Sequence, residues 1–157
     1  MKYNTGFTLI ETLMYSAIVT GFLTFALMIS YQIINSSDRS TDLVELNENQ
    51  QFVTEKIGWA LSNVSAVNSP TSGNSASSLS VNRLNYSGNP IVISLSNGQA
   101  MISTSSLPAV PLSNSHVTVS SLNFRNFNFD GRTGIKFSAI FQNNTSSTSL
   151  DTTFIVK

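Results

Sequence analysis

The chain has 157 residues, which is enough for one compact domain but not for two sizeable cores. Charged residues make up 10% of it, against roughly 25% in ordinary soluble proteins, while Ser, Thr and Asn together number about 59. The formal net charge is +0, and no basic run points to nucleic acid by charge alone. Because the chain has no cysteine, a disulfide framework and a thiolate metal site are excluded.

The N-terminal segment carries most of the hydrophobicity. From Phe7 to Ile34 the sole charged residue is Glu11. A helix of that length measures about 42 Å, more than the roughly 30 Å hydrocarbon core of a bilayer, and it is too long for the apolar core of a secretory signal. We therefore predict a membrane-spanning helix over residues 7–35. Lys2 favours a cytoplasmic N-terminus, with the rest of the chain outside.

Glu11 is the unusual residue of this segment. A carboxylate inside a membrane helix costs roughly 2.5–3.5 kcal/mol on insertion scales, and such residues usually have a partner and a function. No Lys, Arg or His lies within reach in the segment, so a cation must come from elsewhere. The alternative is a carboxylate near the headgroups that snorkels to water and has no role.

The run Gly6-Phe7-Thr8-Leu9-Ile10-Glu11-Thr12-Leu13, with Lys2 before it and the apolar run after it, resembles the prepilin signature of type IV pilins, type II secretion pseudopilins and competence pilins. The resemblance covers about the first 35 residues. It implies that residues 1–6 are a leader and that a membrane prepilin peptidase cuts between Gly6 and Phe7 and N-methylates Phe7. It also implies that Glu11 pairs with the terminal amine of a neighbouring subunit during assembly, which relieves the cost of a buried, unpaired carboxylate.

Gly21 lies in the middle of the predicted span. Glycine is about 1 kcal/mol less favourable than alanine inside a helix. The resemblance implies that the helix loosens near Gly21 when subunits pack in a filament. Close helix–helix packing at a small residue is the alternative.

Beyond the span, apolar residues continue at steps of three and four. They predict an amphipathic helix over residues 36–69 that continues the first helix and ends at Ser69-Pro70. Trp59 and Leu61 flank this stripe, and we expect both in the core. The stripe consists of Leu43, Leu46, Val53, Ile57, Ala60, Val64 and Val67, with Gln50 as a polar interruption.

Residues 70–157 predict an antiparallel β-rich head that forms one globular domain with residues 36–69. A polar loop is expected over 70–78 and another over 143–149, with a stiff crossover over 107–111. Asn97-Gly98 predicts a type I′ hairpin and Asp130-Gly131 a turn. A slip in the apolar phase predicts a bulge near Ser120-Ser121. Strands are expected over residues 79–86, 91–96, 99–103, 116–124, 134–142 and 152–157.

The predicted fold is therefore α+β: one long N-terminal helix packed on an antiparallel sheet. The order of elements resembles J-type minor pseudopilins of type II secretion and W-like minor pilins. The resemblance implies a structural subunit of a type IV pilus-like or type II secretion filament. Its implied partners are prepilin peptidase, other pilins or pseudopilins, an inner-membrane assembly platform and lipid. Its implied location is the bacterial cytoplasmic membrane, and then a periplasmic or cell-surface filament.

Three other functions stay open. The chain can be a major pilin, or a plain single-pass protein that is neither cleaved nor assembled. It can also be a membrane-anchored binding module for DNA or surfaces. Nucleic-acid contact would then use Arg125, Arg132 and Lys136, whose aromatic neighbours suit stacking on bases. These neighbours are Phe124, Phe127 and Phe129.

An enzymatic function is not expected. His116 is the single histidine, and no nucleophile-elbow glycines, phosphate loop or dinucleotide fingerprint accompany it. Asp130 and Asp151 stand alone in the sequence, whereas calcium needs several clustered oxygen ligands. We predict neither a cofactor nor a metal.

Overall fold

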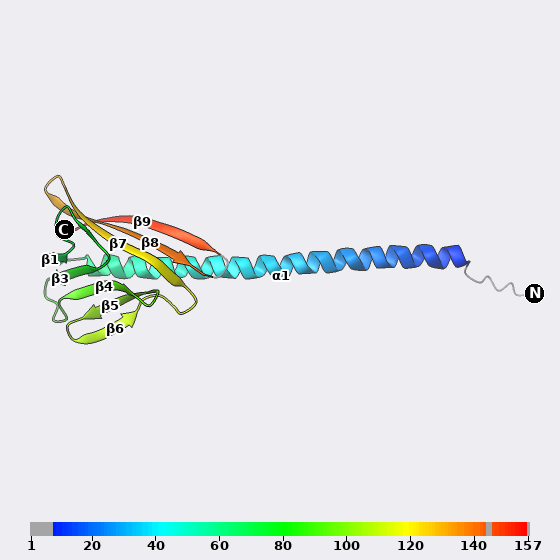
Figure 1. Ribbon diagram of the computed structural model, residues 1–157, viewed down its shortest axis with the longest axis horizontal. Coiled ribbons are helices and arrows are strands. Elements are labelled where there is room, and N and C mark those ends of the chain that lie inside the picture. The colour runs from blue at the N-terminus through cyan, green and yellow to red at the C-terminus, as the bar shows by residue number, and fades with distance from the viewer. Residues whose placement is uncertain (1–7, 144–145, 157) are drawn as a thin grey trace, which may run out of the picture. The chain divides into compact units, whose positions relative to one another are not determined.

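The computed structural model describes residues 8–143 and 146–156. The predicted α+β fold is confirmed: the described residues form one helix, α1 (Leu9–Ala60), and two antiparallel sheets (Figure 1). The strands are β1 (Val64–Ser69), β2 (Ser75–Ala76), β3 (Leu79–Arg83), β4 (Ile91–Ser96), β5 (Gln99–Thr104), β6 (Leu107–Pro111), β7 (Thr118–Phe129), β8 (Arg132–Gln142) and β9 (Ser147–Ile155). The chain divides into two compact units, residues 1–40 and residues 41–157. The boundary between the two units follows Ser40.

The first unit contains α1 up to Ser40. Its apolar side chains are exposed on every side, and no residue of its most apolar 18-residue window is buried. The hydroxyl groups in this segment bond to the helix's own backbone: Thr12, Ser16, Thr24 and Ser30 each donate to a carbonyl three or four residues earlier. These polar groups are therefore satisfied within the helix, as a bilayer interior requires.

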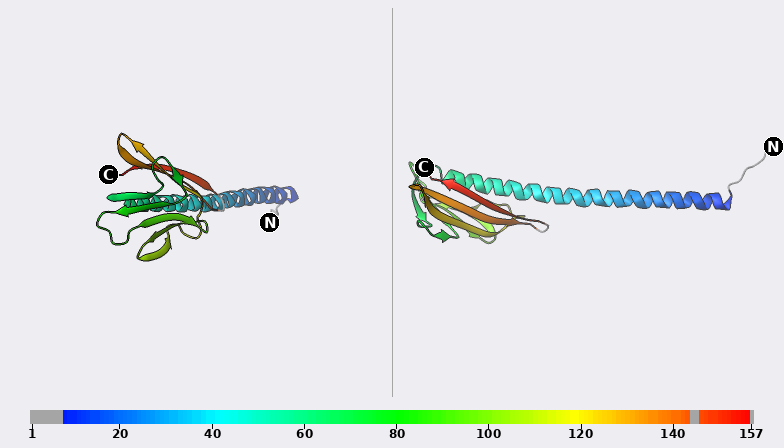
Figure 2. Two further views of the ribbon diagram at one scale, coloured as in Figure 1. Left: turned by 60° about the vertical axis from the view of Figure 1, so that its left-hand side comes forward. Right: turned by 90° about the horizontal axis from the view of Figure 1, so that it is seen from above.

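The second unit packs the rest of α1 on two sheets. Their strand orders are β1-β3-β4-β5-β6 and β2-β7-β8-β9, and every pair is antiparallel. Figure 2 shows the strands of this unit from two further sides. The predicted stripe faces the core at Leu46, Val53, Ile57 and Ala60, all fully buried, whereas Leu43 is 44% exposed. The stripe packs against sheet residues that are also fully buried, among them Ile93, Phe124, Phe137 and Phe141.

The predicted end of the helix at Ser69 is wrong, because α1 ends at Ala60 and residues 64–69 form β1. The last turn tightens, with the Ser62 N–H donating to the Trp59 carbonyl. Asn63 then adopts a left-handed conformation, with φ of 53°, and this stops the helix. Val64 and Val67 still contact the core, but from a strand with register shifts on β3.

Two hairpins follow the local rules. Asn97 and Gly98 both have positive φ, 50° and 73°, which is the type I′ geometry predicted between β4 and β5. The turn at Asp130-Gly131 repeats that geometry, with φ of 51° and 73°, and joins β7 to β8. The predicted bulge is confirmed by a register shift between Val119 and Ser121.

Three segments differ from the prediction. Residues 107–111 form β6, an edge strand rather than a crossover, and an edge is where a sheet tolerates proline. The short strand β2 lies inside the predicted loop of residues 70–78. The last strand begins at Ser147 rather than at residue 152, because exposed and half-buried side chains alternate along Ser147–Ile155 and the strand pairs with β8 along its whole length.

Asn49 joins α1 to the connection that follows β6. It is nearly buried; its Oδ1 accepts from the Asn114 N–H at 2.9 Å, and its Nδ2 donates to the Glu45 carbonyl at 2.9 Å. Asn114 in turn accepts from the N–H groups of His116 and Val117. One buried amide therefore supports the chain that leads into β7.

Asn49→Ala should lower the free energy of unfolding by about 1 kcal/mol, because the Asn114 N–H loses its partly buried hydrogen-bond partner. Asn47→Ala, on an exposed turn of the same helix, should change it by less than about 0.5 kcal/mol. Urea unfolding of the full chain in detergent, followed by fluorescence of the single tryptophan, measures both. Equal losses for the two variants would contradict this role.

Candidate functional site

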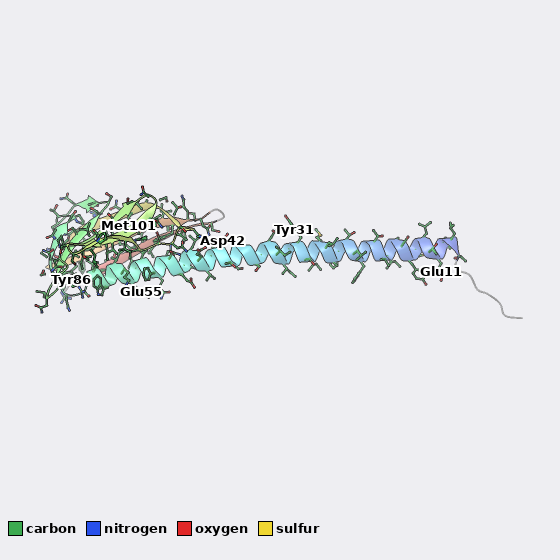
Figure 3. The ribbon with its side chains drawn as sticks, turned by 90° about the horizontal axis from the view of Figure 1, so that it is seen from below. Glu11, Tyr31, Asp42, Glu55, Tyr86 and Met101 are labelled. Carbon is green, nitrogen blue, oxygen red and sulfur yellow. The ribbon has the colours of Figure 1, made fainter. Side chains whose placement is uncertain are left out.

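Glu11 lies in the first turn of α1, at its N-terminal end (Figure 3). Gly6 and Phe7, the predicted cleavage and methylation residues, lie outside the described residues. Thr8 directly precedes the helix, and its Oγ1 accepts from the Glu11 N–H at 3.3 Å. Threonine and glutamate at this spacing are the signature of a capping box, a sequence signal for the role of Thr8 that we had not used. Glu11 is thereby held on the first turn.

Tyr15 is a second residue that sequence reasoning missed. Its Oη donates to Glu11 Oε1 at 3.4 Å from one turn further along α1. The spacing of four residues was the available signal, since such residues share a helix face. The phenol is a neutral partner, and Glu11 forms no ion pair with any described residue. The described chain therefore offers the carboxylate a hydrogen bond but no cation.

Gly21 lies within continuous helix. A Cβ added there would meet no atom within 4 Å, so the described chain does not need a glycine for packing at this point. The helix is not interrupted near Gly21. Loosening inside a filament stays a prediction, as does close packing against a neighbour.

The three basic residues proposed for nucleic-acid contact are only partly brought together. Arg125 and Lys136 are exposed cross-strand partners on β7 and β8, whereas Arg132 lies at the turn between these strands. Lys136 Nζ lies 3.7 Å from Asp151 Oδ1. That exposed pair partly neutralises the basic patch.

The aromatic residues nearby are mostly not available for stacking on bases. Phe124 is fully buried and stacks on Phe137, with 5.5 Å between the ring centroids. Phe127 is half-buried, and its ring covers the place where Gly134 would carry a Cβ. Phe129 alone of the three is largely exposed, at 68%. These three rings therefore do not form an exposed row on which successive bases could stack beside the cations.

His116 lines an open polar hollow together with Asp42, Glu45, Gln142 and Asn143. Its backbone N–H donates to Asn114, which fixes this part of the chain. In the part of the chain that the structure describes, no three metal-ligating side chains are grouped to hold an ion. The hollow has the chemistry of a hydrated surface.

Trp59 is not in the core, contrary to the prediction, whereas Leu61 is buried as expected. The indole ring is 39% exposed and lies edge-on to Tyr86, with 5.7 Å between the ring centroids. The Arg83 guanidinium stacks 4.4 Å from the indole centroid and donates to the carbonyl and hydroxyl of Ser62. A planar cation thus covers an aromatic ring at the surface.

No protein-family model, no curated protein and no solved structure matches this chain. What the chain does is therefore inferred from its own residues.

The full chain should resist alkaline carbonate extraction from bacterial membranes, because its exposed apolar helix is long enough to span a bilayer. Val19→Arg combined with Phe22→Arg should move it to the soluble fraction, since each arginine costs roughly 2.5–3.5 kcal/mol near the middle of a span. Leu43→Arg, in the second unit, is the control and should leave extraction unchanged. Release of the unmodified chain by carbonate would contradict the candidate span.

Proposed function

We propose that the protein is a structural filament subunit of the type IV pilin-like class, a minor pilin or pseudopilin that prepilin peptidase cuts between Gly6 and Phe7. The observation that carries the proposal is Glu11. It is a lone carboxylate in an apolar helix exposed on all sides, it has no ion-pair partner among the described residues, and it follows Phe7 by four residues.

Cleavage would create the missing cation. In the uncut chain the Phe7 nitrogen belongs to a peptide bond and carries no charge. After cleavage it is an α-amine, whose ordinary pKa of roughly 7.7–8.0 leaves it mostly positive at neutral pH. A neighbour's amine beside Glu11 would form a charge-assisted pair in an apolar setting, where such pairs are strongest.

Tyr15 would serve the subunit before assembly. Its hydroxyl satisfies one carboxylate oxygen while the helix is surrounded by lipid. A single neutral hydrogen bond compensates little of the cost of a charge in hydrocarbon. The carboxylate therefore retains a drive to dock against a cation, and the neighbouring amine supplies it.

The apolar surface of the first unit supports the same function. Its side chains find no cover within the described chain, so lipid or other helices must cover them. Single-pass insertion with the head outside would cover these side chains with lipid. Lateral packing of helices in a filament would then cover them with other subunits. The assembly platform and the other pilins or pseudopilins are the partners this requires.

Intact mass measurement tests the processing. Co-expression with an active prepilin peptidase should remove residues 1–6 and add one methyl group to Phe7. Without the peptidase the full mass should persist. Failure to lose residues 1–6, while the peptidase processes a control prepilin in the same cells, would overturn the proposal.

Glu11→Ala should still be processed but should enter sheared filaments at least about tenfold less well, because the charge-assisted pair is lost. Asp151→Ala is the control, an exposed carboxylate on β9 in the second unit whose loss removes only an exposed ion pair. The fraction of processed protein in the filament pellet measures both. Normal recovery of the Glu11 variant would contradict the proposed pairing. A sheared filament made mainly of this chain would identify it as the major subunit.

A further inference from the structure

An apolar groove lies between α1 and the edge strand β6 in the second unit. It has a volume of about 220 Å³, and Lys56, Trp59, Tyr86, Leu107 and Val110 line it. We call it the β6 groove. Trp59, Leu107 and Val110 are 39%, 62% and 51% exposed, which makes a contiguous apolar surface at the rim. Exposed apolar surface of this kind marks an interaction site more often than isolated apolar residues do.

The β6 groove is suited to side chains rather than to an added strand. β6 is the edge of its sheet, but Pro108 and Pro111 carry no backbone N–H and so remove two donors from it. Pairing of another strand along this edge is therefore disfavoured. A partner would therefore contact the aromatic and aliphatic side chains that line the groove.

The groove is basic at its helix side. Lys56 lines it, and Arg83 stacks on Trp59 and on Tyr86, at 4.4 Å and 5.8 Å from the ring centroids. Neither cation forms an ion pair with a described residue. A partner with carboxylates beside an apolar side chain would complement this lining.

The same unit exposes such a surface on α1 next to the groove: Glu55 lies one turn before Trp59, and Glu48 lines a hollow with Pro111 and Leu112. Val44, Glu48, Gln51 and Glu55 follow one another at steps of four, three and four, so they share one helix face, and all four are exposed. We call this face the acidic stripe (Glu55 is labelled in Figure 3). Val44 is 55% exposed, and neither Glu48 nor Glu55 pairs with a described cation.

We propose that the acidic stripe of one copy docks in the β6 groove of a second copy, with Glu48 and Glu55 against Lys56 and Arg83 and with Val44 against the apolar rim. The contact joins two different surfaces. Because the stripe borders the groove on each copy, two copies can make the contact twice about a twofold axis. This contact would give the proposed filament a link between heads, and it rests on the proposed function only for bringing copies side by side.

Because the chain has no cysteine, disulfide trapping can test the contact directly. Two differently tagged full-length copies, one with Val44→Cys and one with Val110→Cys, are expressed together with prepilin peptidase in bacterial membranes and oxidised mildly. A disulfide-linked pair carrying both tags is expected. Each single-cysteine copy expressed alone should give no pair, because position 44 does not meet position 44, nor 110 meet 110.

Charge reversal checks that the trapped contact is the one proposed. Lys56→Glu in the Val110→Cys copy should reduce the linked pair about fivefold or more, and Glu48→Lys in the Val44→Cys copy, which leaves Glu55 to face Arg83, should restore it. Lys136→Glu is the matched control, an exposed lysine on β8 outside both surfaces, and should have no effect.

Two results would overturn the inference: no mixed pair, or cross-links from position 110 to other proteins but not to this chain. The result of this experiment can be distinguished from the result of the test of the proposed function. Normal processing and Glu11-dependent filament recovery without the mixed pair would reject the head contact alone. A mixed pair in a chain that the peptidase does not cut would reject the proposed processing and keep the contact.

Discussion

The burial of one apolar stripe of α1 against two sheets is the interaction on which the second unit depends. Leu46, Val53, Ile57 and Ala60 are fully buried, and each large side chain of this kind contributes roughly 1.5–3 kcal/mol when it leaves water. Neither sheet closes on itself, so each needs a cover for its apolar face. With no disulfide in the chain, this packing carries the stability of the unit.

Polar contacts fix the register of that packing. Gln50 interrupts the stripe, and its amide donates to the Thr148 hydroxyl on β9 at 3.3 Å. Asn49 binds the connection after β6, and Gly58 leaves room for the Phe154 ring, 3.3 Å from where a Cβ would lie. A helix sliding along the sheets would break these contacts together. The apolar stripe stabilises the packing of the helix on the sheets, and these polar contacts determine where along the sheets the helix lies.

The first unit obeys the opposite rule, because its helix is apolar on every side and nothing described within the chain covers it. Under the proposed function its cover comes first from lipid and then from other subunits. Both surroundings are apolar, so the exchange changes the hydrophobic term little. The charge on Glu11 then decides which surroundings are preferred, because only the filament offers it a cation. Tyr15 moderates that preference without removing it.

Local rules predicted much of the fold. The hairpins at Asn97-Gly98 and Asp130-Gly131 need left-handed residues, and Asn, Asp and Gly are the residues that accept that conformation. Local rules did not predict the residue at which α1 ends. Val64 and Val67 fit a helical step of three, and pairing with β3, a tertiary effect, made them a strand.

The candidate sites divide in the same way. The run from Gly6 to Glu11 can be read without a structure, and so can the spacings that join Thr8 and Tyr15 to Glu11. Trp59 was expected in the core because its helical position borders the apolar stripe. In the structure Trp59 is 39% exposed and contacts Tyr86 and the guanidinium of Arg83 instead. The β6 groove combines residues from α1 and from a strand far along the chain, and only the folded chain brings them together.

The hydroxyl groups of the first unit have a consequence for reversibility. Thr12, Ser16, Thr24 and Ser30 form their hydrogen bonds with their own helix, so these four bonds are the same in any apolar surroundings. A subunit leaving a filament would have no such bond to replace, and the separation of one ion pair would be the main electrostatic cost. Such a helix could return from a filament to the bilayer without a change in its internal hydrogen bonds, and could then enter a filament again.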